Sequence, residues 1–272
     1  MQAHKPFDNF LLVSDMDGTL LNRDFSIHPV NLEAIGRFIE KGGRFTVATG
    51  RADSSASHYI RQVRMNAPGI LCNGSAIYDF AERAFIWTHP LPGTCVPVIE
   101  EVLRRFPDIG AEAYHNGDIY IINENDYTTK HVVDEQIPYQ VTSISDAPGP
   151  WTKVLFAGET DRLREIEKMV GKMTLDGFYF VFSGLHYFEM LAAGVSKGST
   201  LEILADLLQI PRERTAAIGD YYNDLEMIRR AGIGAAVADA PEQVRAQADT
   251  VVCACREGAV ADFIASLERR FS

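Results

Sequence analysis

Several features that would set this chain apart from ordinary globular proteins are scarce or absent in its sequence. Its 272 residues contain only four cysteines, which form no pair of CxxC units, so neither a disulfide scaffold nor a zinc ribbon is predicted. No long apolar run follows the first methionine, so no signal peptide is predicted. Other apolar runs are far shorter than the ~20 residues that cross a bilayer. We therefore expect a soluble, cytoplasmic protein with reduced thiols.

Basic residues are also in the minority. The 26 Lys and Arg residues are outnumbered by 37 Asp and Glu residues, which gives a formal net charge of −11. Nucleic acids and anionic membranes are bound through basic faces, so we expect neither as a partner. An anionic small molecule would need positive charge concentrated locally, for example on a metal ion. The sequence leaves the oligomeric state open.

Short apolar strands alternate with helical patterns at the start of the chain. The order is strand, helix, strand, helix, strand, over residues 9–14, 29–41, 44–48, 52–64 and 69–72. This order predicts a parallel sheet with right-handed crossovers. The same pattern resumes near the C-terminus, with helices at 196–209, 225–231, 242–247 and 259–270 and strands at 215–218, 233–237 and 250–252. The fold class predicted is α/β, with a doubly wound, mostly parallel sheet.

The middle of the chain has a different character. It holds several β-rich stretches, at residues 84–88, 118–123, 153–157, 178–182 and 187–191, with helical patterns near 96–106 and 162–171. With 272 residues, the chain exceeds the ~100–200 residues of a typical domain. We therefore expect residues 1–83 and 191–272 to form the sheet core, and residues 84–190 to be an inserted α+β domain.

Two carboxylates directly follow the first predicted strand, in the motif Asp15-Met16-Asp17-Gly18. Ligands of open α/β sheets bind beyond the carboxyl ends of the strands, so Asp15 and Asp17 lie where a site is expected. Two close carboxylates repel each other unless a cation relieves them, and Mg²⁺ prefers oxygen ligands. Taken alone, the motif is explained equally well by a turn in which Asp and Gly are ordinary turn residues.

A second acidic motif, Gly219-Asp220-Tyr221-Tyr222-Asn223-Asp224, also follows a predicted strand. Helix capping accounts for Asn223 or Asp224 alone. It does not account for aspartates at the ends of two separate strands. The two motifs together therefore predict a Mg²⁺ shell that contains three carboxylates.

Two further motifs could hold an anion. Thr49-Gly50-Arg51 follows the second predicted strand, where a hydroxyl group and an accessible backbone could contact an oxyanion, although helix capping by Thr49 is the simpler explanation. Lys197 follows Ser196 in the first turn of a predicted helix. The helix dipole disfavours a lysine there, so an anion nearby would explain it. The alternative is a solvated lysine.

In this order, the motifs DMDGTL (15–20), ATGR (48–51), SKG (196–198) and GDYYND (219–224) resemble those of the haloacid dehalogenase superfamily of phosphotransferases. They are most similar to its Cof-like hydrolase branch with a type IIB cap. Residues 71–78 and 187–267 resemble that branch too. Only 34 positions separate Asp15 from Thr49, whereas 148 separate Thr49 from Lys197. The second interval alone has room for an inserted domain, as in type II caps.

The resemblance implies a role for each motif. Asp15 would be the nucleophile, ionised at neutral pH because the reference pKa of aspartate is ~3.9. Asp17 would first protonate the leaving alcohol and then take a proton from water. Mg²⁺ would be bound by Asp15, the backbone carbonyl of Asp17 and Asp220, with Asp224 in support through water. The phosphate-binding residues implied are Met16, Thr49, Gly50, Lys197 and Asn223.

The implied function is that of a Mg²⁺-dependent phosphatase that hydrolyses small phosphomonoesters, such as sugar phosphates or phosphorylated cofactors. Two alternatives stay open at this point, a sugar phosphomutase and a non-catalytic sensor of phosphorylated metabolites. The sequence departs from the family pattern at Tyr221 and Tyr222, where many relatives carry glycine after the aspartate. In the middle segment, His115 with Asn116, on an expected loop, is a minor candidate for substrate contact, and Glu112 and Tyr114 share that status.

Overall fold

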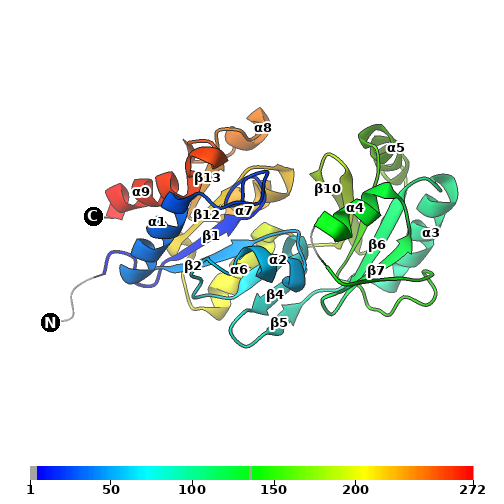
Figure 1. The fold of residues 1–272 in the computed structure, drawn as a ribbon, viewed down its shortest axis with the longest axis horizontal. Helices are drawn as coiled ribbons and strands as arrows, with labels where there is room; N and C mark the ends of the chain where they lie inside the picture. Colours follow the sequence, from blue (N-terminus) through cyan, green and yellow to red (C-terminus); the bar gives the residue numbers. More distant parts are fainter. Residues whose placement is uncertain (1–4, 135–136, 272) are drawn as a thin grey trace. The chain divides into compact units, whose positions relative to one another are not determined.

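The computed structural model describes residues 5–134 and 137–271 (Figure 1). The chain divides into two compact units. The first unit comprises the N-terminal part to Gly50, Ser57–Trp87, and the C-terminal part from Ser196. The second unit comprises Arg51–Ala56 and Thr88–Val195. Among the described residues, no helix combines the length and the apolar character that a membrane span requires.

An eight-stranded sheet forms the first unit, with the strand order β14-β13-β12-β1-β2-β3-β4-β5. The strands from β14 to β3 pair in parallel, and β4 is antiparallel to β3. This confirms the predicted fold class. The strands are β1 (Leu11–Asp15), β2 (Arg44–Ala48), β3 (Gly69–Leu71), β4 (Ala76–Asp79), β5 (Ala84–Thr88), β12 (Thr215–Gly219), β13 (Ile233–Val237) and β14 (Thr250–Val252).

The path of the chain through this sheet determines where a ligand can bind. From β1 the chain proceeds through α1 to β2 and β3. The C-terminal part enters at β12, on the other side of β1, and continues through α7 to β13. The strand order therefore reverses between β1 and β12. In open α/β sheets, such a reversal opens a crevice beyond the carboxyl ends of the strands, and ligands bind there.

Helices cover the sheet of the first unit. The helix α1 (Pro29–Glu40) begins at a proline, whose fixed φ suits a first helical turn. It packs against α9, and Figure 1 shows the two side by side. Leu11 and Val13 of β1 pack instead with Leu201 of α6 and Met227 of α7. The other helices of the first unit are α6 (Lys197–Leu207), α7 (Leu225–Arg230), α8 (Glu242–Arg245) and α9 (Ala259–Phe271). The helix α2 (Asp53–Tyr59) has residues in both units.

A six-stranded sheet with the order β10-β11-β9-β6-β7-β8 forms the second unit. Its neighbouring strands are antiparallel, except that β7 and β8 are parallel. Val154, Phe156 and Met190 pack with Ile99 of α3 and Ile166 of α5 in its hydrophobic core. The elements are α3 (Val96–Arg105), β6 (Gly110–His115), β7 (Asp118–Asn123), α4 (Asp126–Asp134), β8 (Tyr139–Val141), β9 (Lys153–Ala157), α5 (Thr160–Val170), β10 (Phe178–Gly184) and β11 (Tyr187–Ala192).

The expected loop at His115 and Asn116 is only partly correct: His115 is the last residue of β6, and Asn116 lies in the turn that follows it. Glu112 and Tyr114 also lie on β6. Ala and Glu are weak strand formers, so the segment gave no strand signal. Tertiary contacts override that preference. The fully buried Glu112 carboxylate accepts hydrogen bonds from the hydroxyl group of Tyr114 (2.9 Å) and from Nδ1 of His131 (2.9 Å).

Candidate active site

The first and the last of the four motifs meet at the carboxyl ends of neighbouring strands. β1 and β12 pair in parallel with Ser14 opposite Ile218, so Asp15 and Asp220 end up at the same edge of the sheet. Gly18 lies between them with φ +85°, and a Cβ atom there would lie 2.5 Å from Oδ2 of Asp220. Only glycine fits this backbone without strain. The loop after β1 therefore contacts the Asp220 carboxylate directly.

Three carboxylates and one lysine form the centre of the site. Asp15, Asp220 and Asp224 each offer an oxygen atom, and these atoms all lie within 4.8 Å of one another. Nζ of Lys197 donates hydrogen bonds to Oδ1 of Asp15 (2.5 Å) and Oδ1 of Asp224 (2.6 Å). The anions that explain a lysine at a helix start are therefore these two carboxylates.

Lys197 is held in place by the start of α6. Ser196 is the N-cap residue, and its hydroxyl group accepts a hydrogen bond from the backbone N–H of Ser199 (2.9 Å). Gly198 then lets α6 pack closely on α7, because a Cβ atom at this position would lie 2.5 Å from the carbonyl carbon of Glu226. The lysine side chain is only 1% exposed.

Burial shifts the proton affinities of these groups. Burial, followed by the charge of Asp224, raises the pKa of Asp15 well above its ordinary value, against the opposing effect of Lys197. Burial and the charge of Asp224 also raise the pKa of Asp220 to about 7. For Lys197, burial disfavours the charged form, but Asp15 and Asp224 outweigh it and raise the pKa above its ordinary value. The reference pKa of aspartate, which we used for Asp15, therefore does not describe this buried cluster.

The arrangement fits a divalent cation that prefers oxygen ligands. Three carboxylates face a single positive charge on Lys197, so the buried cluster has an excess of negative charge. Among the described residues, Oδ2 of Asp15 is buried and has no hydrogen-bond partner. A buried carboxylate oxygen without a partner is costly, and a metal ion such as Mg²⁺ would satisfy it. Asp15 and Asp220 are the side chains best suited to hold such an ion.

Besides adding negative charge to the cluster, Asp224 stabilises the loop after β12. Its Oδ2 accepts hydrogen bonds from the backbone N–H groups of Asp220 (3.0 Å) and Tyr221 (3.1 Å). Its Oδ1 accepts the hydrogen bond from Lys197. Because both oxygens are engaged within the protein, Asp224 orients its neighbours as well as adding negative charge.

Thr49, Gly50 and Asn223 are connected through Asn73. The backbone N–H of Asn73 donates to the carbonyl oxygen of Thr49 (2.9 Å), and Nδ2 of Asn223 donates to Oδ1 of Asn73 (2.9 Å). A Cβ atom on Gly50 would lie 3.0 Å from Nδ2 of Asn73. Since Asp15 pairs with Ala48 across β1 and β2, the second motif also reaches the edge of the sheet where Asp15 lies.

Met16 and Asp17 do not belong to the carboxylate cluster. The side chain of Met16 is fully buried, and its carbonyl oxygen accepts hydrogen bonds from the backbone of Leu20 (2.9 Å) and Leu21 (2.7 Å). Its side chain is therefore part of the core, and only its backbone could contact a ligand. Asp17 is exposed and is not one of the three clustered carboxylates, although its charge contributes to the raised pKa of Asp15.

Two residues of the site were given no role by the sequence motifs. The hydroxyl group of Thr19 donates to Oδ1 of Asp220 (3.1 Å), and Asn73 connects Thr49 to Asn223 as described above. Asn73 is the second residue after β3, within η1 (Cys72–Gly74). The rule that placed Asp15 and Asp220 at strand ends could therefore have identified it. Thr19 gave no such signal, because it lies four residues beyond the strand end.

Comparisons with known proteins identify similar sequences and structures. Pyridoxal phosphate phosphatase YbhA of Escherichia coli (strain K12) is 25% identical, over 94% of this chain and 97% of its own. The HMP-PP phosphatase of Escherichia coli O81 (strain ED1a) is 29% identical, over 93% of this chain and 94% of its own. The crystal structure of a haloacid dehalogenase-like hydrolase from Bacteroides thetaiotaomicron superposes with a TM-score of 0.82 at 28% identity, covering 96% of this chain and 99% of the other.

The profile of one protein family matches nearly the whole chain. It is the profile of the haloacid dehalogenase-like hydrolases, and it matches residues 12–264. That span includes all four sequence motifs and every residue of the carboxylate cluster. The chain therefore belongs to the haloacid dehalogenase-like hydrolase family, as its motifs predicted.

Proposed function

We propose that this protein is a Mg²⁺-dependent phosphatase that hydrolyses small phosphomonoesters through a phosphorylated Asp15. The observation that carries the proposal is the environment of Asp15. One of its oxygens accepts a hydrogen bond from Lys197, and the other is buried without a partner among the described residues, next to two further carboxylates. A cation bound beside Asp15 would satisfy this oxygen and leave the carboxylate positioned for attack on a phosphorus atom. The curated relatives reported above are both named phosphatases.

In the first step, an oxygen of Asp15 attacks the phosphorus atom of the substrate, and the bond from phosphorus to the leaving oxygen breaks. Asp17 donates a proton to that oxygen, so the alcohol leaves in its neutral form. In the second step, water attacks the phosphorus atom and Asp17 accepts the proton of the water. The bond from phosphorus to Asp15 then breaks, releasing inorganic phosphate and restoring both carboxyl groups to their initial state.

Positive charge is needed while the phosphoryl group is transferred. Bound Mg²⁺ would be held by Asp15, Asp220 and the backbone carbonyl of Asp17, with Asp224 in support, and it would neutralise charge on the phosphoryl oxygens. Lys197 supplies a second positive charge in the same buried cluster.

Polar groups around the cluster would hold the phosphoryl group in line for attack. We assign this role to the hydroxyl group of Thr49, the backbone at Met16 and Gly50, the side-chain amide of Asn223, and Lys197. In support of Asn223, its Nδ2 donates one of its two N–H groups to Oδ1 of Asn73, so the other can donate to a phosphoryl oxygen. The amide is thus held in one orientation at the edge of the site.

We propose that the second unit, built mainly from Thr88–Val195, is the inserted cap that we expected at residues 84–190, and that it selects the substrate. The two curated relatives are named for pyridoxal phosphate and HMP-PP. We infer that the substrate of this protein is likewise a small phosphorylated metabolite, and that it is hydrolysed in the cytoplasm.

The test is a screen of sugar phosphates, phosphorylated cofactors and other small phosphomonoesters, with release of inorganic phosphate measured in Mg²⁺ and in EDTA. We expect steady release from at least one compound in Mg²⁺ only, and a severe loss of rate in Asp17→Asn. The exposed Asp8→Asn variant is the matched control, because it makes the same chemical change before the start of β1, at the opposite end of the strand from Asp15. Binding of phosphorylated compounds without any hydrolysis would contradict the proposal and favour a sensor.

A further inference from the structure

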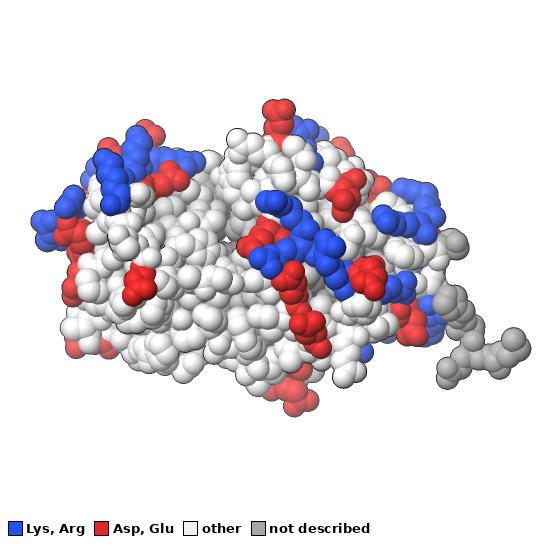
Figure 2. All heavy atoms as spheres, turned by 180° about the vertical axis from the view of Figure 1, so that it is seen from behind, with Lys and Arg blue, Asp and Glu red and all other residues white. Residues whose placement is uncertain are grey.

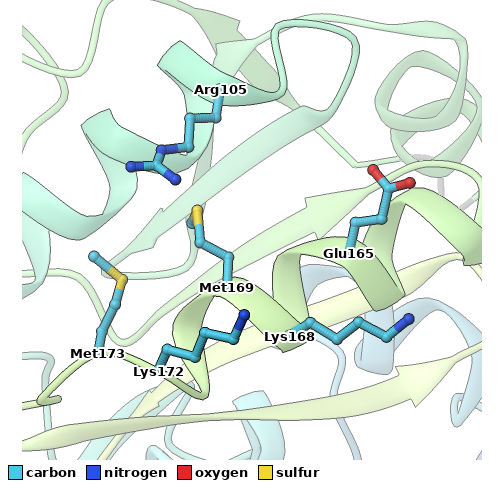
Figure 3. A pocket seen from close by; sticks show the side chains of 6 residues that line it. All are labelled: Arg105, Glu165, Lys168, Met169, Lys172 and Met173. Atoms are coloured by element: carbon cyan, nitrogen blue, oxygen red, sulfur yellow. The ribbon is translucent and has the colours of Figure 1, made fainter.

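A cavity in the second unit lies outside the carboxylate cluster and its neighbours. Its volume is about 390 Å³, which falls in the range of ~300–1,000 Å³ that is typical of small-molecule sites. It lies between the end of α3, which contributes Arg105, and the last turns of α5 with the residues that follow (Figure 3). The side chains that line it are Arg105, Glu165, Lys168, Met169, Lys172 and Met173.

The charge that lines this cavity is mainly positive. Its one carboxylate, Glu165, is already paired with Arg162. Within 5–134 and 137–271, no carboxylate lies within 4 Å of the ammonium group of Lys168 or Lys172. These two positive charges are therefore available to an anion.

Arg105 adds a third positive charge. It donates a hydrogen bond to Glu101 (2.5 Å), but Arg104 also binds Glu101 through two hydrogen bonds (2.8 and 2.9 Å). One carboxylate thus serves two guanidinium groups, so among the described residues Arg105 has no carboxylate partner of its own. Figure 2 shows that the charged residues are unevenly distributed: Lys and Arg gather in groups, with Asp and Glu beside them, between broad areas without charge.

The apolar part of the lining is formed by two methionines. Met169 and Met173 are partly buried and pack against the hydrophobic core of the second unit. In Figure 3 both rise from α5 and the segment after it toward Arg105, and Lys172 extends beneath Met169. Thioether side chains adapt to ligands of different shape. The cavity therefore combines an adaptable apolar wall with cationic groups at its rim.

The helix dipole alone explains the positions of two of these cations. Cations are favoured near helix C-termini by the helix dipole, and Arg105 and Lys168 lie in the last turns of α3 and α5. This effect does not account for the hollow between the helices or for its methionine wall. Nor does it account for Lys172, which lies two residues beyond the end of α5.

We propose that this cavity is a binding site for a small amphipathic anion, with an aromatic or short aliphatic body and one phosphate, sulfonate or carboxylate group. The body lies against Met169 and Met173, and the anionic group is bound by Lys172, which extends beneath Met169, while Lys168 and Arg105 add positive charge to the lining (Figure 3). The site is independent of the proposed phosphatase reaction, since none of its residues belongs to the carboxylate cluster.

The probe for this site is 8-anilinonaphthalene-1-sulfonate, whose fluorescence rises when its aromatic rings leave water. We expect saturable binding to one site per chain in the full-length protein. In Lys168→Gln/Lys172→Gln, we expect the dissociation constant to increase about fivefold to tenfold, because each exposed cation contributes modestly. The control Lys5→Gln/Lys130→Gln removes the same charge from two other exposed lysines, and its affinity is expected to equal that of the wild type.

A neutral probe of similar shape, N-phenyl-1-naphthylamine, tests the need for an anionic group. We expect it to bind at least fivefold more weakly than the sulfonate in the wild type, and equally weakly in both double variants. The replacement Met169→Glu should abolish sulfonate binding. If Lys168→Gln/Lys172→Gln binds the sulfonate as tightly as the wild type does, or if the neutral probe binds as tightly as the sulfonate, the proposal is wrong. Lysine-to-glutamine changes on the surface are compatible with folding, so this outcome does not depend on Met169→Glu.

Discussion

Asp220→Asn should make the metal-free protein more stable while it removes the response to Mg²⁺. The Asp220 side chain lies in the cluster with Asp15 and Asp224, and burial together with the charge of Asp224 raises its pKa to about 7. The amide has the same shape and no charge. Its oxygen can still accept the hydrogen bond that Thr19 donates to Oδ1. The substitution therefore removes repulsion without opening a cavity.

The magnitude follows from the change in pKa. A carboxyl group whose pKa rises from 3.8 to about 7 on folding holds its proton more tightly in the folded protein than in the unfolded chain. Stability is therefore greatest below about pH 4, decreases as the pH rises to about 7, and stays low above that. One pKa unit corresponds to ~1.4 kcal/mol, so ionised Asp220 lowers the free energy of unfolding by about 4 kcal/mol at pH 8. Removing that cost should raise the melting temperature by roughly 5–10 °C.

Thermal unfolding of the wild type and Asp220→Asn, at pH 8 and pH 5, with EDTA or with Mg²⁺, measures this effect. We expect the variant to melt higher in EDTA at pH 8, with a much smaller difference at pH 5, where Asp220 of the wild type is protonated. Mg²⁺ should stabilise the wild type and leave the variant nearly unchanged. The exposed Asp8→Asn, before the start of β1, is the matched control. A variant that melts below the wild type in EDTA at pH 8, or equal stabilisation of both by Mg²⁺, would refute the reasoning.

Three further outcomes are expected. Lys197→Met removes the cation between buried carboxylates, so it should lower the free energy of unfolding in EDTA by about 3–5 kcal/mol, as chemical denaturation would show. Gly18→Ala places a Cβ atom 2.5 Å from the Asp220 carboxylate at a positive φ, so phosphatase activity should fall steeply; Gly36→Ala, with no atom within 4 Å of the added Cβ, should retain full activity. Burial and the nearby charge of Asp220 raise the pKa of Cys255 to about 12, so iodoacetamide at pH 8 should modify this thiol only after unfolding. Peptide mass spectrometry checks this, and rapid labelling of the native protein would contradict it.

Parts of the fold could be predicted from the sequence, because there the local hydrophobic pattern and the tertiary contacts favour the same secondary structure. The strands β13 and β14 have the predicted bounds: β13 is a short apolar run of the kind that a buried parallel strand requires. Segments stabilised by distant polar partners gave no such signal. β6 exists with a buried glutamate because His131 of α4 and Tyr114 satisfy its carboxylate. Neither β6 nor α4 was predicted, since the pairing connects residues 19 positions apart.

The sequence predicted which residues of the candidate site lie at strand ends, but it did not predict how their side chains are directed. Parallel strands end at one edge of a sheet, which is sufficient to bring Asp15 and Asp220 together. The direction of a side chain depends on packing that the motifs do not contain. The motifs therefore did not predict that the ammonium group of Lys197 donates hydrogen bonds to Asp15 and Asp224. Burial of Asp15, which raises its pKa, likewise depends on the folded surroundings.

The most direct test of the proposed reaction is to trap the phosphorylated residue. The protein is mixed with a phosphomonoester that it hydrolyses, quenched in acid during turnover, and reduced with borohydride, which converts an acyl phosphate on aspartate to homoserine. Peptide mass spectrometry should find homoserine at position 15 with substrate and Mg²⁺, and none in EDTA or in Asp15→Asn. Homoserine at a different aspartate, or continued release of phosphate by Asp15→Asn, would contradict the assignment of Asp15 as the nucleophile.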